Sequence, residues 1–61
     1  MKVYETRPGD TPMVIANEQL GDADRWREVA EFNAATHPHM GPHDWYRIGT
    51  FLRLPEVADG R

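Results

Sequence analysis

Three histidines and one aspartate form the densest group of candidate metal ligands in the chain. They are His37, His39, His43 and Asp44. Imidazole nitrogens and carboxylate oxygens suit zinc or nickel. The surrounding residues are rich in proline and glycine, so no helix would align ligands four positions apart. We therefore expect ordinary polar loop residues here, with no bound metal and no cofactor.

Groups that could carry out catalysis are scarce. The sequence contains no cysteine and no serine, which are the most common side-chain nucleophiles. Asp22 and Asp24 could act as a pair of carboxylates, but both stand where a helix is expected to begin, and capping of that helix explains them. A site deep enough to exclude water would also consume most of the core of so small a domain. We expect a protein without enzymatic activity.

An aromatic pair followed by an arginine, Trp45, Tyr46 and Arg47, is the third chemically distinctive group. Tryptophan, tyrosine and arginine are enriched among residues that dominate protein interfaces. Aromatic side chains also supply much of the apolar mass of protein cores. Two interpretations therefore stay open, in which the two rings either cover the core or contact a partner protein.

All of these residues except Asp22 and Asp24 belong to residues 34–49, which are rich in proline, glycine and histidine. Loops of this length are uncommon in small domains, and they are usually functional or ordered by a partner. The elements on either side of this loop must therefore position it.

The first elements are a strand and a helix. Residues 3–6 are β-branched or aromatic at three of four positions and predict a short strand, and residues 7–10 predict a turn. Thr11 followed by Pro12 predicts a helix start, because a threonine hydroxyl accepts from free amides and proline suits the first helical position. Apolar residues then recur at helical spacing up to Leu20, and Gly21 predicts a left-handed residue that ends the helix.

A second helix and a second strand follow. Asp22 and Asp24 predict the N-terminus of the second helix. Its apolar stripe consists of Trp26, Val29, Ala30 and Asn33, and we expect Trp26 to belong to the core. Residues 51–54 alternate in polarity and stop at a proline, which predicts a closing strand.

The predicted order is strand, helix, helix, strand, which is an α+β fold. Two strands at opposite ends of the chain can pair only with each other, and a two-stranded sheet is marginal unless helices cover it. We therefore expect a two-stranded antiparallel sheet with two helices packed on one face. This domain would span residues 1–55, followed by a short polar tail at residues 56–61.

Composition excludes several function classes. The 61 residues include seven basic and ten acidic side chains, for a net charge of −3, and the isoelectric point is near 5.4. Without a basic patch, we expect neither nucleic-acid binding nor attachment to an anionic membrane surface. No apolar run reaches the roughly 20 residues of a membrane span, and no apolar signal region follows Met1. If Met1 is the natural start, the protein is expected to work inside the cell.

Several motifs together resemble the LysM domain family. They comprise a turn with the sequence Pro-Gly-Asp-Thr, a central asparagine and a closing Gly-x-x-Leu-x-Leu-Pro. The matching residues are Tyr4 to Thr11, Ile15-Ala16, Gly21-Asp22, Trp26, Asn33 and Gly49 to Pro55. The resemblance spans nearly the whole chain and implies a βααβ fold, which agrees with the order predicted from the residues.

The resemblance also implies a binding site. LysM domains typically bind N-acetylglucosamine chains of peptidoglycan or chitin in a shallow groove between the first turn and the second helix–strand loop. In this chain the corresponding residues are Gly9, Asp10, Thr11, Pro12 and Asn33. Each has a structural interpretation as well: Gly9 would form a tight turn, Asp10 and Thr11 would cap a helix, and Asn33 would tie the long loop to its own backbone.

The resemblance is greatest to the small LysM proteins in the baseplates of contractile phage tails and related injection systems, which carry a similar Gly-Asp…Arg-Trp segment, here residues 21–28. These proteins are structural adaptors that join the central hub and spike to surrounding baseplate subunits. The first hypothesis is therefore a baseplate adaptor, cytoplasmic and assembled into a tail-like particle, with Trp45, Tyr46 and Arg47 at a protein interface. The alternative is a cell-wall-associated module that binds peptidoglycan or chitin.

Overall fold

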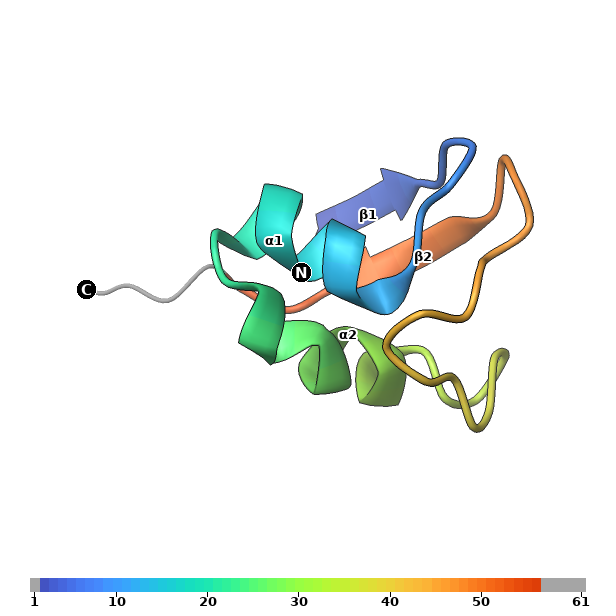
Figure 1. The fold of residues 1–61 in the computed structure, drawn as a ribbon. Helices are drawn as coiled ribbons and strands as arrows, with labels where there is room; N and C mark the ends of the chain where they lie inside the picture. Colours follow the sequence, from blue (N-terminus) through green and yellow to red (C-terminus); the bar gives the residue numbers. More distant parts are fainter. Residues whose placement is uncertain (1, 57–61) are drawn as a thin grey trace.

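The computed structural model describes residues 2–56 and has the predicted order of elements (Figure 1). These elements are strand β1 (Lys2–Glu5), helix α1 (Pro12–Leu20), a 3₁₀ turn η1 (Ala23–Arg25), helix α2 (Trp26–Phe32) and strand β2 (Phe51–Leu54). The predicted βααβ arrangement is thereby confirmed. Of the predicted polar tail, only Glu56 lies within the described residues.

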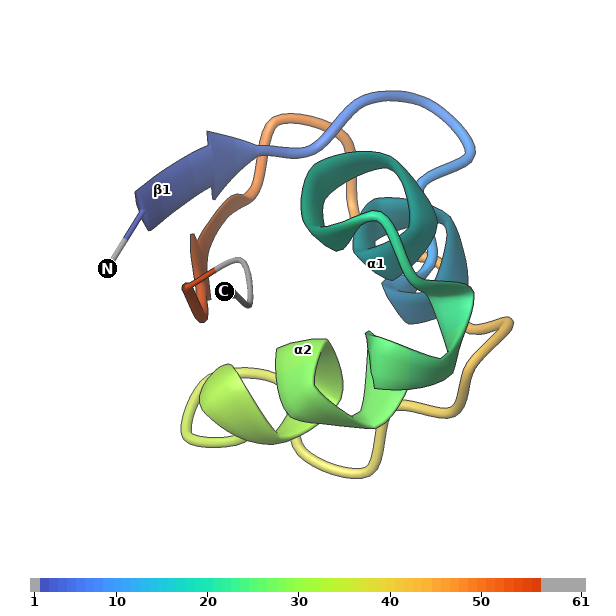
Figure 2. The same cartoon turned by 90° about the vertical axis from the view of Figure 1, so that its left-hand side faces the viewer.

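The two strands form a two-stranded antiparallel sheet with Val3 opposite Arg53 and Tyr4 opposite Leu52. Both helices lie on the same side of this sheet (Figure 2). On that side β2 contributes Leu52 and Leu54, which are fully buried. The other face of the sheet is not covered by either helix.

A single core fills the space between the sheet and the helices. Its buried members come from both helices, from β2 and from the long loop: Ile15, Ala16, Leu20, Val29, Tyr46, Leu52 and Leu54. Trp26 was predicted to lie in the core, but it is only half-buried and packs against the core from its edge. The guanidinium of Arg27 lies 5.1 Å from the centre of its ring. Trp26 therefore covers the core rather than filling it.

The ends of helix α1 match the sequence prediction. Thr11 is the N-cap, and its hydroxyl oxygen accepts a hydrogen bond from the Val14 amide at 3.2 Å. Pro12 occupies the first helical position, where a missing N–H leaves no bond unmade. Gly21 has a φ of 75° and ends the helix in the left-handed conformation. The Asp22 carboxylate then caps the 3₁₀ turn that leads into α2, since it accepts from the Asp24 amide at 2.9 Å.

The long loop closes back on the first half of the chain. The Met13 amide donates to the Pro42 carbonyl at 3.2 Å, and the Tyr46 amide donates to the Asp10 carbonyl at 3.1 Å. Thr6 holds the end of the loop, because its hydroxyl donates to the Arg47 carbonyl at 2.7 Å. The loop is thus ordered by the domain itself and lies against the turn between β1 and α1.

Within residues 2–56, no helix combines the length and the apolar character that crossing a membrane requires.

Candidate binding cleft

A shallow cleft of about 570 Å³ lies between the first turn and the end of the long loop. Its lining residues are Pro8, Gly9, Trp45, Tyr46, Arg47 and Ile48. One wall therefore comes from the turn after β1, and the other comes from the loop that leads into β2. The hydrogen bond between Tyr46 and Asp10 joins these two walls at the backbone.

The turn wall is fixed by Asp10. Its carboxylate is 2% exposed and accepts from the Arg7 amide at 2.8 Å and from the Tyr4 hydroxyl at 2.5 Å. Asp10 thus closes the turn. The sequence had predicted that both Asp10 and Thr11 cap helix α1, but the N-cap is Thr11. Gly9 lies in this turn with a φ of 83°, a conformation that favours glycine. Burial, together with the hydrogen bond to Asp10, raises the pKa of the Tyr4 hydroxyl.

The loop wall contains one buried and one exposed aromatic ring. Tyr46 is 4% exposed and belongs to the core, whereas Trp45 is 77% exposed. The Tyr46 ring meets the ring of His37 edge-on, with centroids 5.3 Å apart. Its hydroxyl is buried and has no hydrogen-bond partner among residues 2–56, and burial raises the pKa of Tyr46 to about 12. The two interpretations of the aromatic pair therefore divide between its members: Tyr46 fills the core, and Trp45 is free to contact a partner.

The accessible surface of the cleft is apolar with one positive charge. Trp45 and Ile48 are exposed, at 77% and 65%. Arg47 is also exposed, and its side chain makes no ion pair or hydrogen bond with the part of the chain that the structure describes. The cleft offers apolar contacts and one guanidinium to a ligand, and its opposite wall offers the backbone of Gly9.

The residues implied by the family resemblance are only partly brought together. Gly9 lies in the cleft, and Asp10 supports it from behind. Thr11 and Pro12 are buried at the start of α1. Asn33 lies elsewhere, because its side chain bonds to the backbone of Val29 and Arg53. Its side chain joins α2 to β2. The prediction that it ties the long loop to its own backbone was wrong.

Sequence reasoning missed two cleft residues, Pro8 and Ile48. Pro8 precedes Gly9 in the predicted turn, and this position is the signal that could have pointed to it. Ile48 is a large apolar residue within a polar loop, and such a residue is a signal either of core packing or of contact with a ligand. Neither could be identified as lining a cleft before the pairing of the two chain segments was known.

The histidine-rich segment makes local contacts. The Nδ1 atom of His37 lies 2.9 Å from the Thr36 hydroxyl, and the Asp44 carboxylate accepts from the Gly41 amide at 2.7 Å. In the described range 2–56, histidines and acidic residues form no group of three or more that could hold a metal ion.

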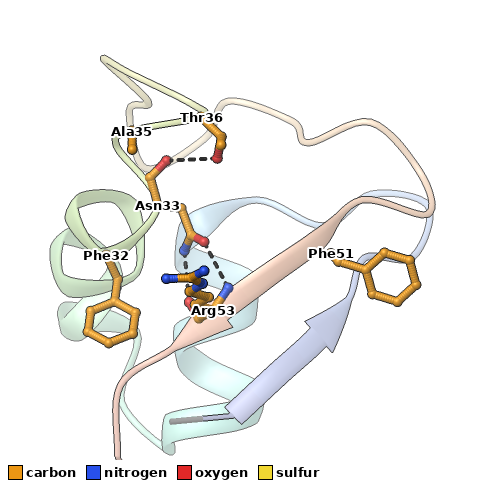
Figure 3. Close-up of a pocket in the computed structure, with 6 residues that line it drawn as sticks. All are labelled: Phe32, Asn33, Ala35, Thr36, Phe51 and Arg53. Carbon is orange, nitrogen blue, oxygen red and sulfur yellow. Dashed lines mark hydrogen bonds between the residues drawn. The ribbon is translucent and has the colours of Figure 1, made fainter.

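A second, smaller pocket of about 310 Å³ lies between the end of α2 and β2 (Figure 3). Its lining residues are Phe32, Asn33, Ala35, Thr36, Phe51 and Arg53. The side-chain amide of Asn33 already makes its hydrogen bonds within the domain, to the backbone of Arg53.

Comparison with known proteins adds no relative: no family model matches the chain, and neither the curated proteins nor the solved structures contain a significant match. The function must therefore be argued from the residues and geometry of the cleft.

Proposed function

We propose that this protein is a non-catalytic structural adaptor, a LysM-like component of the inner baseplate of a contractile, phage-tail-like injection system. In this role it links the central hub and spike to surrounding baseplate subunits. The cleft lined by residues 8–9 and 45–48, called the 8–9 and 45–48 cleft below, contacts one of these subunits. The protein would be made in the cytoplasm and assembled into the particle.

The exposure of Trp45 beside Arg47 is the observation that carries this proposal. A tryptophan that is 77% exposed buries little apolar surface in the isolated domain. Tryptophan and arginine are also the residues that most often dominate the energy of protein interfaces. Ile48 and Pro8 enlarge the apolar surface around Trp45. Such a surface is suited to becoming buried against another protein subunit.

The polar residues of the family motif support the same choice. Asp10, Thr11 and Asn33 are buried, and their side chains already hydrogen-bond within the domain. They have little remaining capacity to bind the hydroxyl and acetamido groups of a sugar. Recognition by the cleft therefore depends mainly on Trp45, Arg47 and Ile48, whose side chains suit a protein surface.

Co-purification with candidate baseplate subunits would test the proposal. The protein should be co-expressed with the hub, spike and wedge subunits encoded near its own gene, and the amount retained by each subunit measured. We expect Trp45→Ala and Arg47→Ala to reduce retention at least tenfold without lowering the melting temperature. Arg27→Ala, an exposed arginine on α2 outside the cleft, is the matched control and should leave retention unchanged.

The alternative function is binding of peptidoglycan or chitin chains, in which case the protein would be associated with the cell wall. One observation favours it: the backbone amides of Gly9, Trp45 and Ile48 make no hydrogen bond within residues 2–56. Free amides beside an exposed aromatic ring suit an acetamido sugar, which needs hydrogen bonds and an apolar platform.

Titration with N-acetylglucosamine oligomers would separate the two functions. The glycan-binding function would be supported if the sugar shifts the Gly9, Trp45 and Ile48 amide signals in nuclear magnetic resonance spectra and the protein is retained on insoluble peptidoglycan. If the protein also binds no hub or wedge subunit, the adaptor function would be wrong. Retention on a baseplate subunit with no response to the sugar would support the adaptor.

A further inference from the structure

The face of the sheet opposite the helices carries an apolar pair and a pair of opposite charges. Four side chains occupy it: Val3 and Glu5 from β1, and Phe51 and Arg53 from β2. Val3 is 60% exposed and Phe51 is 68% exposed, although both are types that normally favour the core. This outer sheet face is separate from the 8–9 and 45–48 cleft.

The strand register fixes how these four side chains are arranged. Val3 stands opposite Arg53, and Glu5 stands opposite Phe51. Successive side chains on one face of a strand are two residues apart. The four residues therefore occupy the corners of a quadrilateral, with the apolar residues on one diagonal and the charged residues on the other.

The two charges lack partners within the domain. Neither the Glu5 carboxylate nor the Arg53 guanidinium makes an ion pair or a side-chain hydrogen bond among residues 2–56. Other charges in the same range do form pairs, as the half-buried Arg25 does with Glu28 at 2.8 Å. Glu5 and Arg53 are thus available to a molecule that approaches this face.

The apolar surface also continues beyond the sheet. Phe51 and Arg53 line the 310 Å³ pocket together with Phe32 of α2 (Figure 3). Phe32 is itself exposed. A molecule that covers the outer sheet face would therefore also border the pocket that Phe32 lines.

We propose that the outer sheet face binds a second copy of this chain through a two-fold axis that runs along the Val3–Phe51 diagonal. This axis lies in the plane between the outer sheet faces of the two copies. Each residue on the diagonal therefore stands opposite the same residue of the second copy. Val3 then meets Val3 of the second copy, and Phe51 meets Phe51. The same rotation exchanges the other two corners, so that each Glu5 faces Arg53 of the second copy.

This axis is the one that satisfies all four corners. A two-fold axis along the charged diagonal would place Glu5 against Glu5 and Arg53 against Arg53, which is repulsive. An axis parallel to the strands would exchange the strands and would place each charge against an apolar residue. The pattern is self-complementary only along the apolar diagonal, as a two-fold interface requires. The strands of the two copies would then cross at a steep angle.

Four side chains and the margin of one pocket form a small interface, and small interfaces are weak. We therefore expect reversible association over protein concentrations from about 10 µM to about 1 mM. Sedimentation equilibrium of the full chain over this range should show the mass rising from the 7.0 kDa of one chain towards twice that value.

Charge reversal provides the decisive test. Glu5→Arg leaves two positive corners and Arg53→Glu leaves two negative corners, so each variant alone should stay monomeric over the same range. An equimolar mixture of the two should associate, because each supplies the charges that the other lacks. The double variant Glu5→Arg with Arg53→Glu restores complementary corners and should associate like the wild type. Circular dichroism spectra would confirm that every variant is folded.

Several results would overturn the proposal. A monomeric wild type up to 1 mM would do so, as would single variants that associate as strongly as the wild type. If Trp45→Ala abolished association and the charge reversals did not, the copies would meet through the cleft instead. Because no baseplate subunit or sugar is present in these measurements, their outcome is independent of the proposed adaptor function.

Discussion

The side chain of Asn33 pairs with the backbone of Arg53 in the way that a neighbouring strand would. Its Oδ1 atom accepts from the Arg53 amide at 2.8 Å, and its Nδ2 atom donates to the Arg53 carbonyl at 2.8 Å. The same Nδ2 atom donates to the Val29 carbonyl at 2.9 Å. One amide side chain thereby satisfies the backbone of Arg53 at the free edge of β2 and fastens this strand to the end of α2. Unpaired strand edges invite aggregation, so this pairing also protects the sheet.

Replacement of Asn33 should therefore be strongly destabilising. Asn33→Ala removes all three hydrogen bonds and leaves the partly buried backbone groups of Arg53 and Val29 without their partner. We expect the free energy of unfolding to fall by about 2 kcal/mol, which is a large share of the stability of a small domain. Urea denaturation followed by circular dichroism would measure the change. Asn17→Ala, at an exposed position in α1, is the matched control and should change stability by less than about 0.5 kcal/mol.

Tyr46 should make the domain sensitive to alkaline pH. An unfolded chain loses the tyrosine proton near pKa 10, whereas burial raises the pKa of folded Tyr46 to about 12. The folded state therefore binds more protons between these values, and stability must fall as the pH rises from about 10 to about 12. Below pH 10 this contribution is fully present. Urea midpoints measured at intervals from pH 8 to pH 12 would show the decline.

Tyr46→Phe is the control for this pH dependence. The variant keeps the ring contact with His37 but removes a buried hydroxyl that has no hydrogen-bond partner in the described part of the chain. We expect stability at pH 7 to be unchanged or higher, because an unsatisfied buried hydroxyl is unfavourable. The alkaline decline should become shallower without disappearing, since the pKa of Tyr4 is raised as well. A variant with the full wild-type decline would contradict the assignment to Tyr46.

The two tryptophans should respond differently to truncation. Trp26 is half-buried against the core, so Trp26→Ala should lower the free energy of unfolding by about 2 kcal/mol, which is below the 3–5 kcal/mol typical of fully buried aromatic residues. Trp45 is exposed, and Trp45→Ala should change stability by less than about 0.5 kcal/mol. Thermal melts of both variants would measure this. Equal losses would show that the contacts of one ring have been assigned incorrectly.

Gly21 should be required for its backbone conformation alone. A Cβ atom added at Gly21 would meet no atom of the described residues within 4 Å, so steric overlap of an alanine plays no part, but the φ of 75° is unfavourable for other residues. Gly21→Ala should lower stability by about 1 kcal/mol. Gly21→Asn should lower it less, because asparagine tolerates the left-handed region. A stabilised alanine variant would mean that the lower entropy of its unfolded chain outweighs the strain.

The sequence was most informative where a residue acts on its immediate neighbours. Thr11, Pro12 and Gly21 determine helix ends through local hydrogen bonds and backbone angles, so the limits of α1 could be predicted. The alternation within residues 51–54, together with the proline that follows, likewise predicted strand β2. Together with the pairing of the terminal strands, these signals were sufficient to derive the fold.

Prediction failed where the partner lies far along the chain. Asn33 bonds to Arg53, twenty positions away, and periodicity contains no information about that distance. Tyr46 and Trp45 are adjacent and similar in type, yet one is buried and the other exposed, because the path of the loop decides which ring faces the core. Ile48 joins the cleft only because Thr6 holds the end of the loop against the first turn.

The pairing of β1 with β2 has a consequence for protein synthesis. β1 is made first and β2 last among the described elements, and the two fully buried leucines of the sheet, Leu52 and Leu54, lie in β2. A nascent chain that ends before residue 54 contains both helices but lacks the complete strand β2, whose leucines cover one side of the core. The domain therefore folds only after almost all of its residues have left the ribosome, and until then Val29 and Ile15 remain open to chaperones and proteases.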